Sequence, residues 1–255
     1  MRKTPSSDKT PASKTFIILC DGDFPSKGPA RKLLEKAQKA KKSHTVISCD
    51  GAILSLLKNG MDADYIVGDM DTLPKKWQAK FKDKIYKESE QDFNDQTKAF
   101  RFALSLIEKH IAEKENSKAK LVADKTASGT EYRIIILGAT GKREDHTLGN
   151  ISYLPDYAQT LRQKFPKLKI NISTVTDYGV FIPILDTTRL KGEPGDRISI
   201  FAFDHTLRIK SEGLEYKTDD VVFDMWWKAT LNTFKKRDVL LRFSHPAKAL
   251  LYFPF

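Results

Sequence analysis

Short apolar runs alternate with amphipathic stretches over the first half of the chain. The runs are β-branched, as is typical of buried strands, and they cover residues 15–20, 45–49 and 65–67, with a shorter one at 84–87. Helical spacing lies between them, at residues 29–42 and 52–59. Pro29 suits the first turn of the first helix, and Gly60 is a natural stop for the second. This order predicts a parallel sheet with helical crossovers.

The same alternation continues further along the chain. The predicted elements are a helix at 91–109, a strand at 133–137 and a helix at 145–154. Asp92 or Asn94 can cap the first of these helices. Residues 112–131 are polar, and we expect them to form a surface loop. The pattern therefore predicts an α/β domain with a Rossmann-like parallel sheet over residues 15–165.

Helical spacing ends near residue 168, and short β-branched runs separated by turn residues replace it. The predicted strands are residues 169–175, 179–185, 197–203, 207–210, 221–223, 239–243 and 250–253. Such runs are typical of an antiparallel sandwich or barrel. We therefore expect a domain boundary near 160–170 and an all-β sandwich over residues 166–255.

Composition supports a folded protein, since 40% of the 255 residues are hydrophobic and 10% are aromatic. Residues 1–14 are rich in Lys, Ser, Thr and Pro without an apolar core, which predicts a disordered tail rather than a secretory signal. No apolar run reaches the roughly 18 residues that a membrane span needs. Cys20 and Cys49 are too few for a disulfide framework, which favours a cytoplasmic location.

The formal charge of +11 and a pI near 9.4 raise the question of nucleic-acid binding. The lysines lie mostly on predicted helix faces and in residues 75–84, where Trp77 and Phe81 interleave with them. A solvated basic face explains this pattern better than a nucleic-acid site. A non-catalytic protein that binds nucleic acid through residues 75–84 stays as an alternative from another class.

Polar clusters stand at the ends of the predicted strands or at the starts of the helices that follow. They are Asp50-Gly51, Gly68-Asp69-x-Asp71, Gln91-Asp92-x-x-Asp95-x-x-Lys98, and Gly138-x-x-Gly141-x-Arg143-x-Asp145-His146-x-x-x-Asn150. In a parallel sheet these clusters emerge at one edge and can meet. Asp69 and Asp71 alternate along an extended chain and point the same way, and adjacent carboxylates are usually retained to bind a hard cation such as Mg²⁺.

The last of these clusters has the parts of a phosphate site. A glycine loop before a helix offers backbone N–H groups to phosphate, and Arg143 can bind phosphate oxygens bidentately. His146 and Asn150 are four residues apart on the same helix face and can hydrogen-bond a nucleotide. In the competing interpretation, Asp145 caps the helix and His146 is a surface histidine. The chain has no P-loop motif.

Taken together and in this order, the motifs D-G-A, G-D-M-D-T, Q-D-x-x-D-x-x-K and G-A-T-G-x-R-x-D-H-T-x-x-N resemble those of thiamine pyrophosphokinases. The resemblance covers most of residues 45–155. It implies an α/β domain and a β-sandwich domain in a homodimer. It also implies transfer of the diphosphate of ATP to the hydroxyl of thiamine, giving thiamine diphosphate and AMP.

The resemblance also assigns residues. It implies that Mg²⁺ is bound by Asp69, Asp71 and Asp95, and that Asp71, Asp95 and Arg143 take part in catalysis. It implies that ATP is bound by Asp50, Gln91, Asp92, Lys98, Arg143, Asp145, His146 and Asn150. Which carboxylate takes the proton of the acceptor stays open.

The C-terminal half matches the family less closely. Gly213-Leu214-Glu215-Tyr216 is similar to a family segment whose aromatic residue packs near thiamine, and Thr230 and Asn232 fall in the segment that would complete the acceptor site. Leu231 stands where the family has serine, so a related acceptor such as a hydroxymethylpterin is an alternative. Trp226 and Trp227 are expected in the sandwich core or at a dimer interface. The resemblance gives residues 166–255 the role of acceptor binding and dimerisation.

Overall fold

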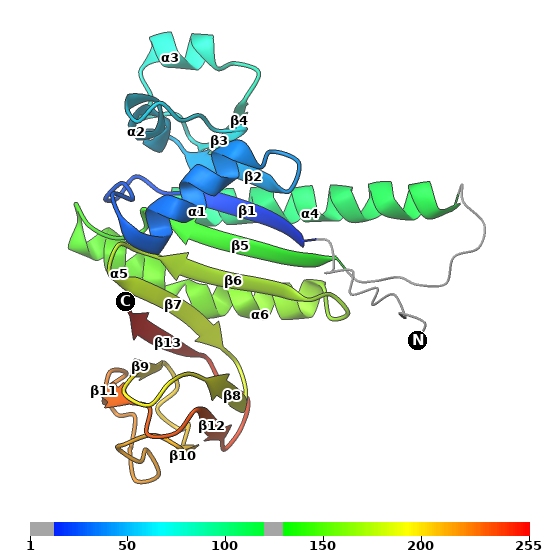
Figure 1. Ribbon diagram of the computed structural model, residues 1–255. Coiled ribbons are helices and arrows are strands. Elements are labelled where there is room, and N and C mark those ends of the chain that lie inside the picture. The colour runs from blue at the N-terminus through cyan, green and yellow to red at the C-terminus, as the bar shows by residue number, and fades with distance from the viewer. Residues whose placement is uncertain (1–12, 120–129) are drawn as a thin grey trace, which may run out of the picture.

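A computed structural model of the protein describes residues 13–119 and 130–255. Its backbone is one 10-stranded sheet and one three-stranded sheet, with helices on both faces of the parallel part of the larger sheet (Figure 1). The larger sheet has the order β11-β9-β13-β7-β6-β5-β1-β2-β3-β4. The predicted fold class, an α/β part followed by a β-sandwich, is confirmed.

The parallel part of the sheet carries the predicted α/β architecture. Its strands are β1 (Ser13–Leu19), β2 (His44–Cys49), β3 (Tyr65–Gly68), β4 (Ile85–Lys87), β5 (Glu131–Leu137) and β6 (Ile170–Val175). All neighbouring pairs among them are parallel. The helices are α1 (Gly28–Lys39), α2 (Ala52–Lys58), α3 (Lys75–Lys80), α4 (Asp95–Ala119), α5 (Glu144–Ser152) and α6 (Leu154–Lys164).

Alternate residues of the central strand β1 bury against opposite helical layers. Phe16 and Ile18 pack into the core beneath α4 and α6, whereas Ile17 and Leu19 pack into the core beneath α1 and α2. Because β1 is covered on both faces, it is apolar along its whole inner length. These two cores hold the strand ends, and hence the polar clusters, in fixed positions.

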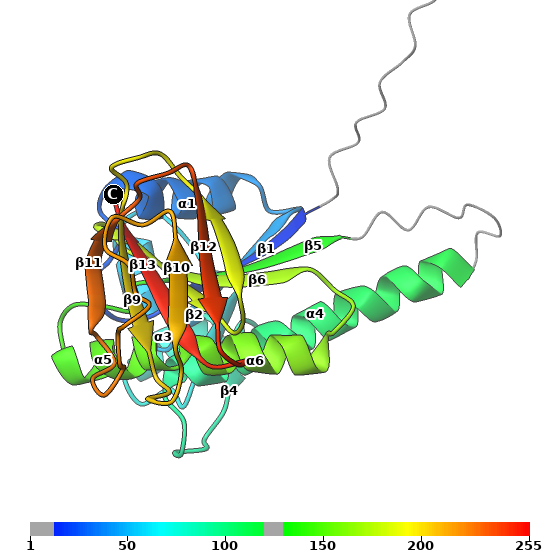
Figure 2. The same ribbon diagram turned by 90° about the horizontal axis from the view of Figure 1, so that it is seen from below.

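The sandwich is built from antiparallel strands that continue the same sheet. They are β7 (Gly179–Ile184), β9 (Arg197–Ala202), β11 (Ala229–Thr233) and β13 (Ala249–Pro254), and they face the three-stranded sheet of β8 (Thr188–Lys191), β10 (Ile209–Glu212) and β12 (Asp238–Phe243). Figure 2 shows these two layers side by side. A separate apolar core, which includes Ile200, Phe223 and Leu241, lies between them.

Several local predictions differ from the structure. Residues 112–131 are not all loop, because α4 continues to Ala119 and β5 begins at Glu131. Residues 221–223 form no strand. The run at 169–175 is β6, which pairs in parallel with β5 and so extends the α/β sheet instead of the sandwich. A β-branched run looks the same in either setting, so its sequence does not distinguish them.

The sequence also missed four elements, namely α3, α6, β8 and β11. Pro155 reads as a helix end, but it lies in the first turn of α6, where a missing N–H is tolerated. Of the predicted disordered tail, residues 1–12 lie outside the described residues, and β1 takes in Ser13 and Lys14. Among the described residues, none of the helices has the length and apolar character needed to cross a bilayer.

Candidate active site

A cavity of about 810 Å³ opens at the carboxyl ends of β1, β2, β3 and β5. Its lining brings together most of the sequence-predicted residues, although they are far apart in the chain. They are Asp69, Asp71, Gln91, Asp92, Asp95, Lys98, Gly141, Arg143, His146 and Asn150. The parallel topology explains this convergence, since all these strands deliver their following loops to one edge.

Three carboxylates converge next to this cavity, and Asp69 and Asp71 line it, whereas Asp50 is not among its lining residues. Asp50, Asp69 and Asp71 each offer an oxygen, and these oxygens lie within 4.8 Å of one another. Asp50 is buried, and its carboxylate accepts the N–H groups of Thr72 at 2.9 Å and Leu73 at 3.2 Å. The donor set is all oxygen, which suits a hard divalent cation such as Mg²⁺.

The geometry therefore favours Asp50 over Asp95 as the third member of this carboxylate group. Asp95 also lies close to Gly68, but it is not part of this group and forms an ion pair with Lys98 at 3.5 Å. A Cβ at Gly68 would come 3.0 Å from the Cβ of Asp50 and 3.2 Å from Oδ1 of Asp95. Glycine at this position lets both carboxylates approach the strand end.

Lys98 supplies the compensating charge inside the site. Its side chain is 2% exposed and lies 3.3 Å from Asp69 and 3.5 Å from Asp95. Burial alone would lower the pKa of Lys98, but its bonds to the two carboxylates outweigh burial and raise it. Lys98 is therefore a fixed cation beneath the carboxylates.

The carboxylates differ in their affinity for protons. Burial raises the pKa of Asp50 to about 6, and the charges of Asp95 and Asp71 act in the same direction. Burial also raises the pKa of Asp95, against the opposing pull of Lys98. For Asp69, burial is outweighed by the N–H of Asp71 and by Lys98, so its pKa is lowered. A divalent cation would stabilise the charged form of all three.

The glycine loop after β5 forms the opposite wall. Gly138 and Gly141 have φ values of +64° and +82°, which side chains rarely adopt. Asn150 is buried, donates to the carbonyl of Ala139 at 2.9 Å, and accepts from Asn94 at 2.9 Å. Asn150 thus ties the loop to the start of α4, and it lines the cavity as well.

Arg143 and Asp145 are exposed and form an ion pair with each other at the start of α5. Hydrogen bonding to Arg143 lowers the pKa of Asp145 to about 2. Arg143 lines the cavity, whereas Asp145 does not. His146 also lines it and is exposed, and its N–H donates to Asp145 at 2.9 Å.

Several residues that line the cavity were assigned no site role from the sequence. They are Cys20, Asp21, Gly22, Cys49, Phe93, Asn94, Gln96 and Lys142, with Thr72 and Ala139. Lys142 and Asp21 form an ion pair at 2.9 Å across the cavity mouth. The signal for Asp21 is present in the sequence, because Cys20-Asp21-Gly22 repeats the Cys49-Asp50-Gly51 pattern at the next strand end.

The predicted acceptor residues lie elsewhere. Tyr216, Thr230 and Asn232 belong to the sandwich, and none of them lines the cavity. Asn232 is 4% exposed, and its amide is bonded to the backbone N–H and carbonyl of Tyr216 at 3.1 and 2.7 Å. Tyr216 itself is 66% exposed. Asn232 therefore shapes the backbone that presents the tyrosine ring.

Other apolar side chains of the sandwich are exposed as well. They include Leu231, which is 85% exposed with a φ of +58°, and the tryptophans at 226 and 227, which are 44% and 51% exposed. Trp226 packs against Phe201 and Phe203, with ring centroids 5.3 and 6.1 Å apart. The expectation of a core position is thus wrong for both tryptophans, and the dimer interface stays a prediction.

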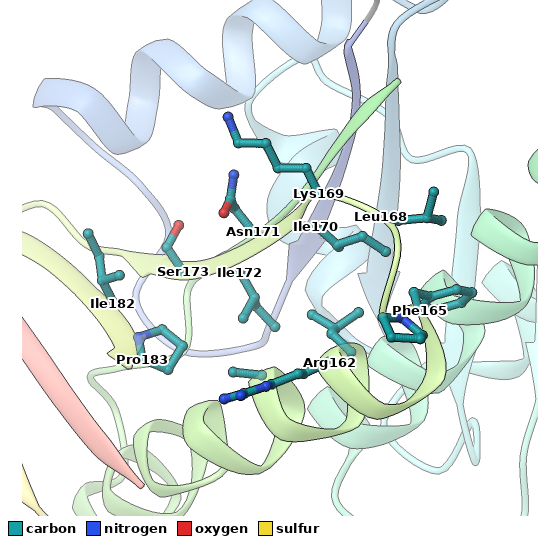
Figure 3. A pocket seen from close by; sticks show the side chains of 13 residues that line it. Arg162, Phe165, Leu168, Lys169, Ile170, Asn171, Ile172, Ser173, Ile182 and Pro183 are labelled. Carbon is teal, nitrogen blue, oxygen red and sulfur yellow. The ribbon is translucent and has the colours of Figure 1, made fainter. Parts of the chain in front are cut away.

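A second cavity, of about 580 Å³, lies between α6 and the strands β6 and β7 (Figure 3). Leu161, Phe165, Ile172 and Ile182 give it apolar walls, Arg162 and Lys169 also line it, and no carboxylate contributes to it. It therefore lacks the carboxylates that a metal site of the first cavity's kind needs. The basic helix α3 also lies apart from the first cavity, since none of its residues lines it.

Comparisons with known proteins agree with this architecture. In solved structures, the chain superposes on thiamin pyrophosphokinase from Candida albicans with a TM-score of 0.67 and 16% identity, covering 100% of this chain and 95% of that one. Yeast thiamin pyrophosphokinase gives a TM-score of 0.67 and 17% identity, covering 98% and 88%. A thiamin pyrophosphokinase family protein from Enterococcus faecalis gives a TM-score of 0.64 and 17% identity, and the match covers 94% of this chain and 99% of that one.

At these identities the structural matches show the fold. No curated protein sequence matches the chain. Family models are more specific: the thiamin pyrophosphokinase catalytic domain matches residues 37–165, and the thiamin pyrophosphokinase substrate-binding domain matches residues 179–252. The first match contains the carboxylates, Lys98 and the glycine loop, and the second contains Tyr216 and Asn232. The chain belongs to the thiamin pyrophosphokinase family.

Proposed function

We propose that this protein transfers the diphosphate of ATP to the hydroxyl of thiamine in a Mg²⁺-dependent reaction that yields thiamine diphosphate and AMP. One observation carries the proposal: Asp69 and Asp71 line the cavity with the buried Lys98 and converge with Asp50, and Ala139 and Gly141 of the glycine loop line the same cavity. Carboxylates for a cation and a glycine loop before a helix, a common phosphate-binding arrangement, thus lie at one cavity.

The reaction breaks one bond and forms one. The thiamine oxygen attacks the β-phosphorus, the bond from that phosphorus to the α,β-bridging oxygen breaks, and AMP leaves with the bridging oxygen. A Mg²⁺ ion on Asp69, Asp71 and a third carboxylate, Asp50 or Asp95, would neutralise charge on the transferred group. Lys98 and Arg143 add fixed positive charge, and a carboxylate of the cluster accepts the hydroxyl proton.

The acceptor half of the site is proposed to come from a second copy of the chain. Supporting this, Tyr216, Thr230 and Asn232 do not line the cavity, and Tyr216 is exposed, as are Leu231, Trp226 and Trp227 of the same sandwich. A homodimer would place the sandwich of one protomer over the cavity of its partner. Residues 166–255 would then serve acceptor binding and dimerisation, and residues 15–165 the chemistry.

We place the activity in the cytoplasm. Cys20, which directly follows β1, and Cys49, in the neighbouring strand β2, are buried thiols that line the cavity and form no disulfide, with sulfurs 4.0 Å apart. Free thiols at this distance suit a reducing compartment.

The test is to incubate the protein with ATP, Mg²⁺ and thiamine, and to separate the products. Equal amounts of AMP and thiamine diphosphate are expected. Accumulation of ADP, or AMP without thiamine diphosphate, would overturn the proposal. Replacing thiamine by a hydroxymethylpterin tests the alternative acceptor, and EDTA tests the dependence on the cation.

A further inference from the structure

Phe93 occupies a distinctive place in the active-site cavity. It lies in the loop between β4 and α4, next to the predicted nucleotide residue Asp92, and it lines the cavity while remaining half-buried. Among the residues that line this cavity, Phe93 is the one hydrocarbon ring; His146 is the one other ring. The rest of the lining is mostly carboxylate, amide, cation or backbone.

One face of this ring is already covered. The guanidinium of Arg101 lies over it, 3.8 Å from the ring centroid. The same guanidinium forms ion pairs with Glu90 at 3.1 Å and Glu88 at 3.5 Å, so it is tied to both the ring and the loop. Arg101 does not line the cavity. The part of the ring that meets the cavity is therefore the part that Arg101 leaves free.

A flat ring held rigidly at the edge of a phosphate and metal site suits the base of a nucleotide. Bases stack on aromatic side chains whatever their hydrogen-bonding edges, because every base has a π-face. The guanidinium behind the ring fixes its orientation before the nucleotide arrives, which reduces the entropy lost on binding.

We propose that Phe93 is the stacking platform for the nucleobase of the donor nucleotide, and that Arg101 is the positioning residue that holds the ring. This inference rests on the proposed function, since it assumes a nucleoside triphosphate donor. It also predicts the donor class: stacking area favours purines over pyrimidines, and it distinguishes ATP from GTP only weakly.

The experiment separates base binding from phosphate binding. Calorimetric titration with AMP and, separately, with inorganic pyrophosphate is carried out on the native protein and on Phe93→Ala. Phe93→Ala is expected to weaken AMP binding by roughly tenfold to a hundredfold. Pyrophosphate binding is expected to stay unchanged, because the ring contacts only the base.

Phe93→Trp keeps a platform and adds a reporter. It should bind AMP about as tightly as the native protein, and AMP, but not pyrophosphate, should quench the added indole fluorescence relative to the native protein. Arg101→Ala should raise the KM for ATP with little change in kcat. Tyr86→Ala is the matched control, because it removes a half-exposed ring of the preceding strand that does not line the cavity.

The outcomes distinguish the two proposals. If the native protein makes thiamine diphosphate and Phe93→Ala binds AMP as tightly as the native protein does, the stacking inference is wrong and the proposed function stands. If Phe93→Ala weakens AMP and pyrophosphate equally, Phe93 only supports the loop, and the inference is also overturned. A native protein that binds neither ATP nor AMP overturns the proposed function itself.

Discussion

The carboxyl edge of the parallel strands and the exposed face of the sandwich differ in burial and in the kind of side chain that they present. At the strand edge, charged groups are buried and paired: Lys98 is 2% exposed between Asp69 and Asp95. On the sandwich, Tyr216 and Leu231 are 66% and 85% exposed, with no covering partner among the described residues. The first region is built within one chain, whereas the second leaves its ring and leucine open to solvent.

The two regions are therefore positioned by different features of the fold. The strand edge uses sheet topology to bring distant carboxylates together, so one chain suffices to build it. The sandwich face uses local backbone geometry, such as the bonds from Asn232 to the backbone of Tyr216, to present a ring outward. The predictions below test whether the two regions are as separate as this comparison states.

The largest effect is expected at the strand edge. Asp71→Asn should lower diphosphate transfer by on the order of a thousandfold, because it removes a carboxylate from a cation site that supplies several kcal/mol. Its fold should survive, since Asp71 is exposed and neutralising it relieves repulsion at the cluster. Initial rates at saturating Mg²⁺ and the unfolding midpoint measure the two effects. Asp83→Asn, an exposed change outside the cavity, is the matched control.

A mixture of two impaired chains, assayed at a thiamine concentration well below the raised KM of Tyr216→Ala, tests whether the regions combine across protomers. Asp71→Asn loses a carboxylate of the strand edge, and Tyr216→Ala loses the aromatic platform for the acceptor. In a random mixture, half of the dimers are mixed and one site in each is intact, so about a quarter of the sites recover. The activity of the mixture is compared with that of each variant alone. Activity that never exceeds the average of the two variants would mean that each chain builds its own complete site.

The strand edge was largely predictable because its signals are local and its convergence follows from topology. Asp69 and Asp71 follow an apolar strand, and a parallel sheet places such ends together. The choice between Asp50 and Asp95 was not predictable, since it depends on which carboxylate oxygens come within 4.8 Å of one another in the folded chain. The stack of Arg101 on Phe93 also requires the loop conformation, because ring and guanidinium are brought together by a bend in the chain.

The sandwich was predictable only as a class. Alternating β-branched runs predict strands, but they do not say that β6 joins the parallel sheet or that Ala229–Thr233 forms a bulged edge strand. The sequence also did not predict that Trp226 and Trp227 are exposed, because aromatic residues usually fill cores. Side chains that serve an interface follow the same sequence pattern as side chains that serve a core.

A smaller effect concerns pH and the metal-free strand edge. The pKa of Asp50 rises from 3.8 to about 6 on folding, so the folded protein binds this proton more tightly. Stability from this group is therefore fully present well below pH 4 and is lost as pH rises through about 6, by about 3 kcal/mol in all. The difference in unfolding free energy between the native protein and Asp50→Asn should fall by most of that amount between pH 4 and pH 7 in EDTA.

The comparison of the two proteins removes the pH dependence of all other groups that they share. If the unfolding free energies of the two proteins changed with pH in the same way, the pKa of Asp50 would not be raised on folding, and the prediction would be wrong. Saturating Mg²⁺ should reverse the fall, since a cation stabilises the charged cluster.

The smallest effect is expected at Leu231 on the sandwich. Its φ of +58° is costly for a branched side chain, and its N–H donates to the hydroxyl of Ser199 at 3.1 Å, so the backbone holds this conformation. Leu231→Ser adds at most one hydrogen bond to an acceptor, worth about 0.5–1.5 kcal/mol, and should lower the KM for thiamine by no more than roughly tenfold.

Tyr216→Ala removes a whole ring and should raise that KM by more than Leu231→Ser lowers it, with both kcat values near that of the native protein. Steady-state kinetics with thiamine measure both, and Leu231→Gly, which suits the same backbone, controls for released strain. If only Leu231→Ser turned over thiamine, the leucine would select a different acceptor, and the exposed face of the sandwich would set specificity instead of adjusting affinity.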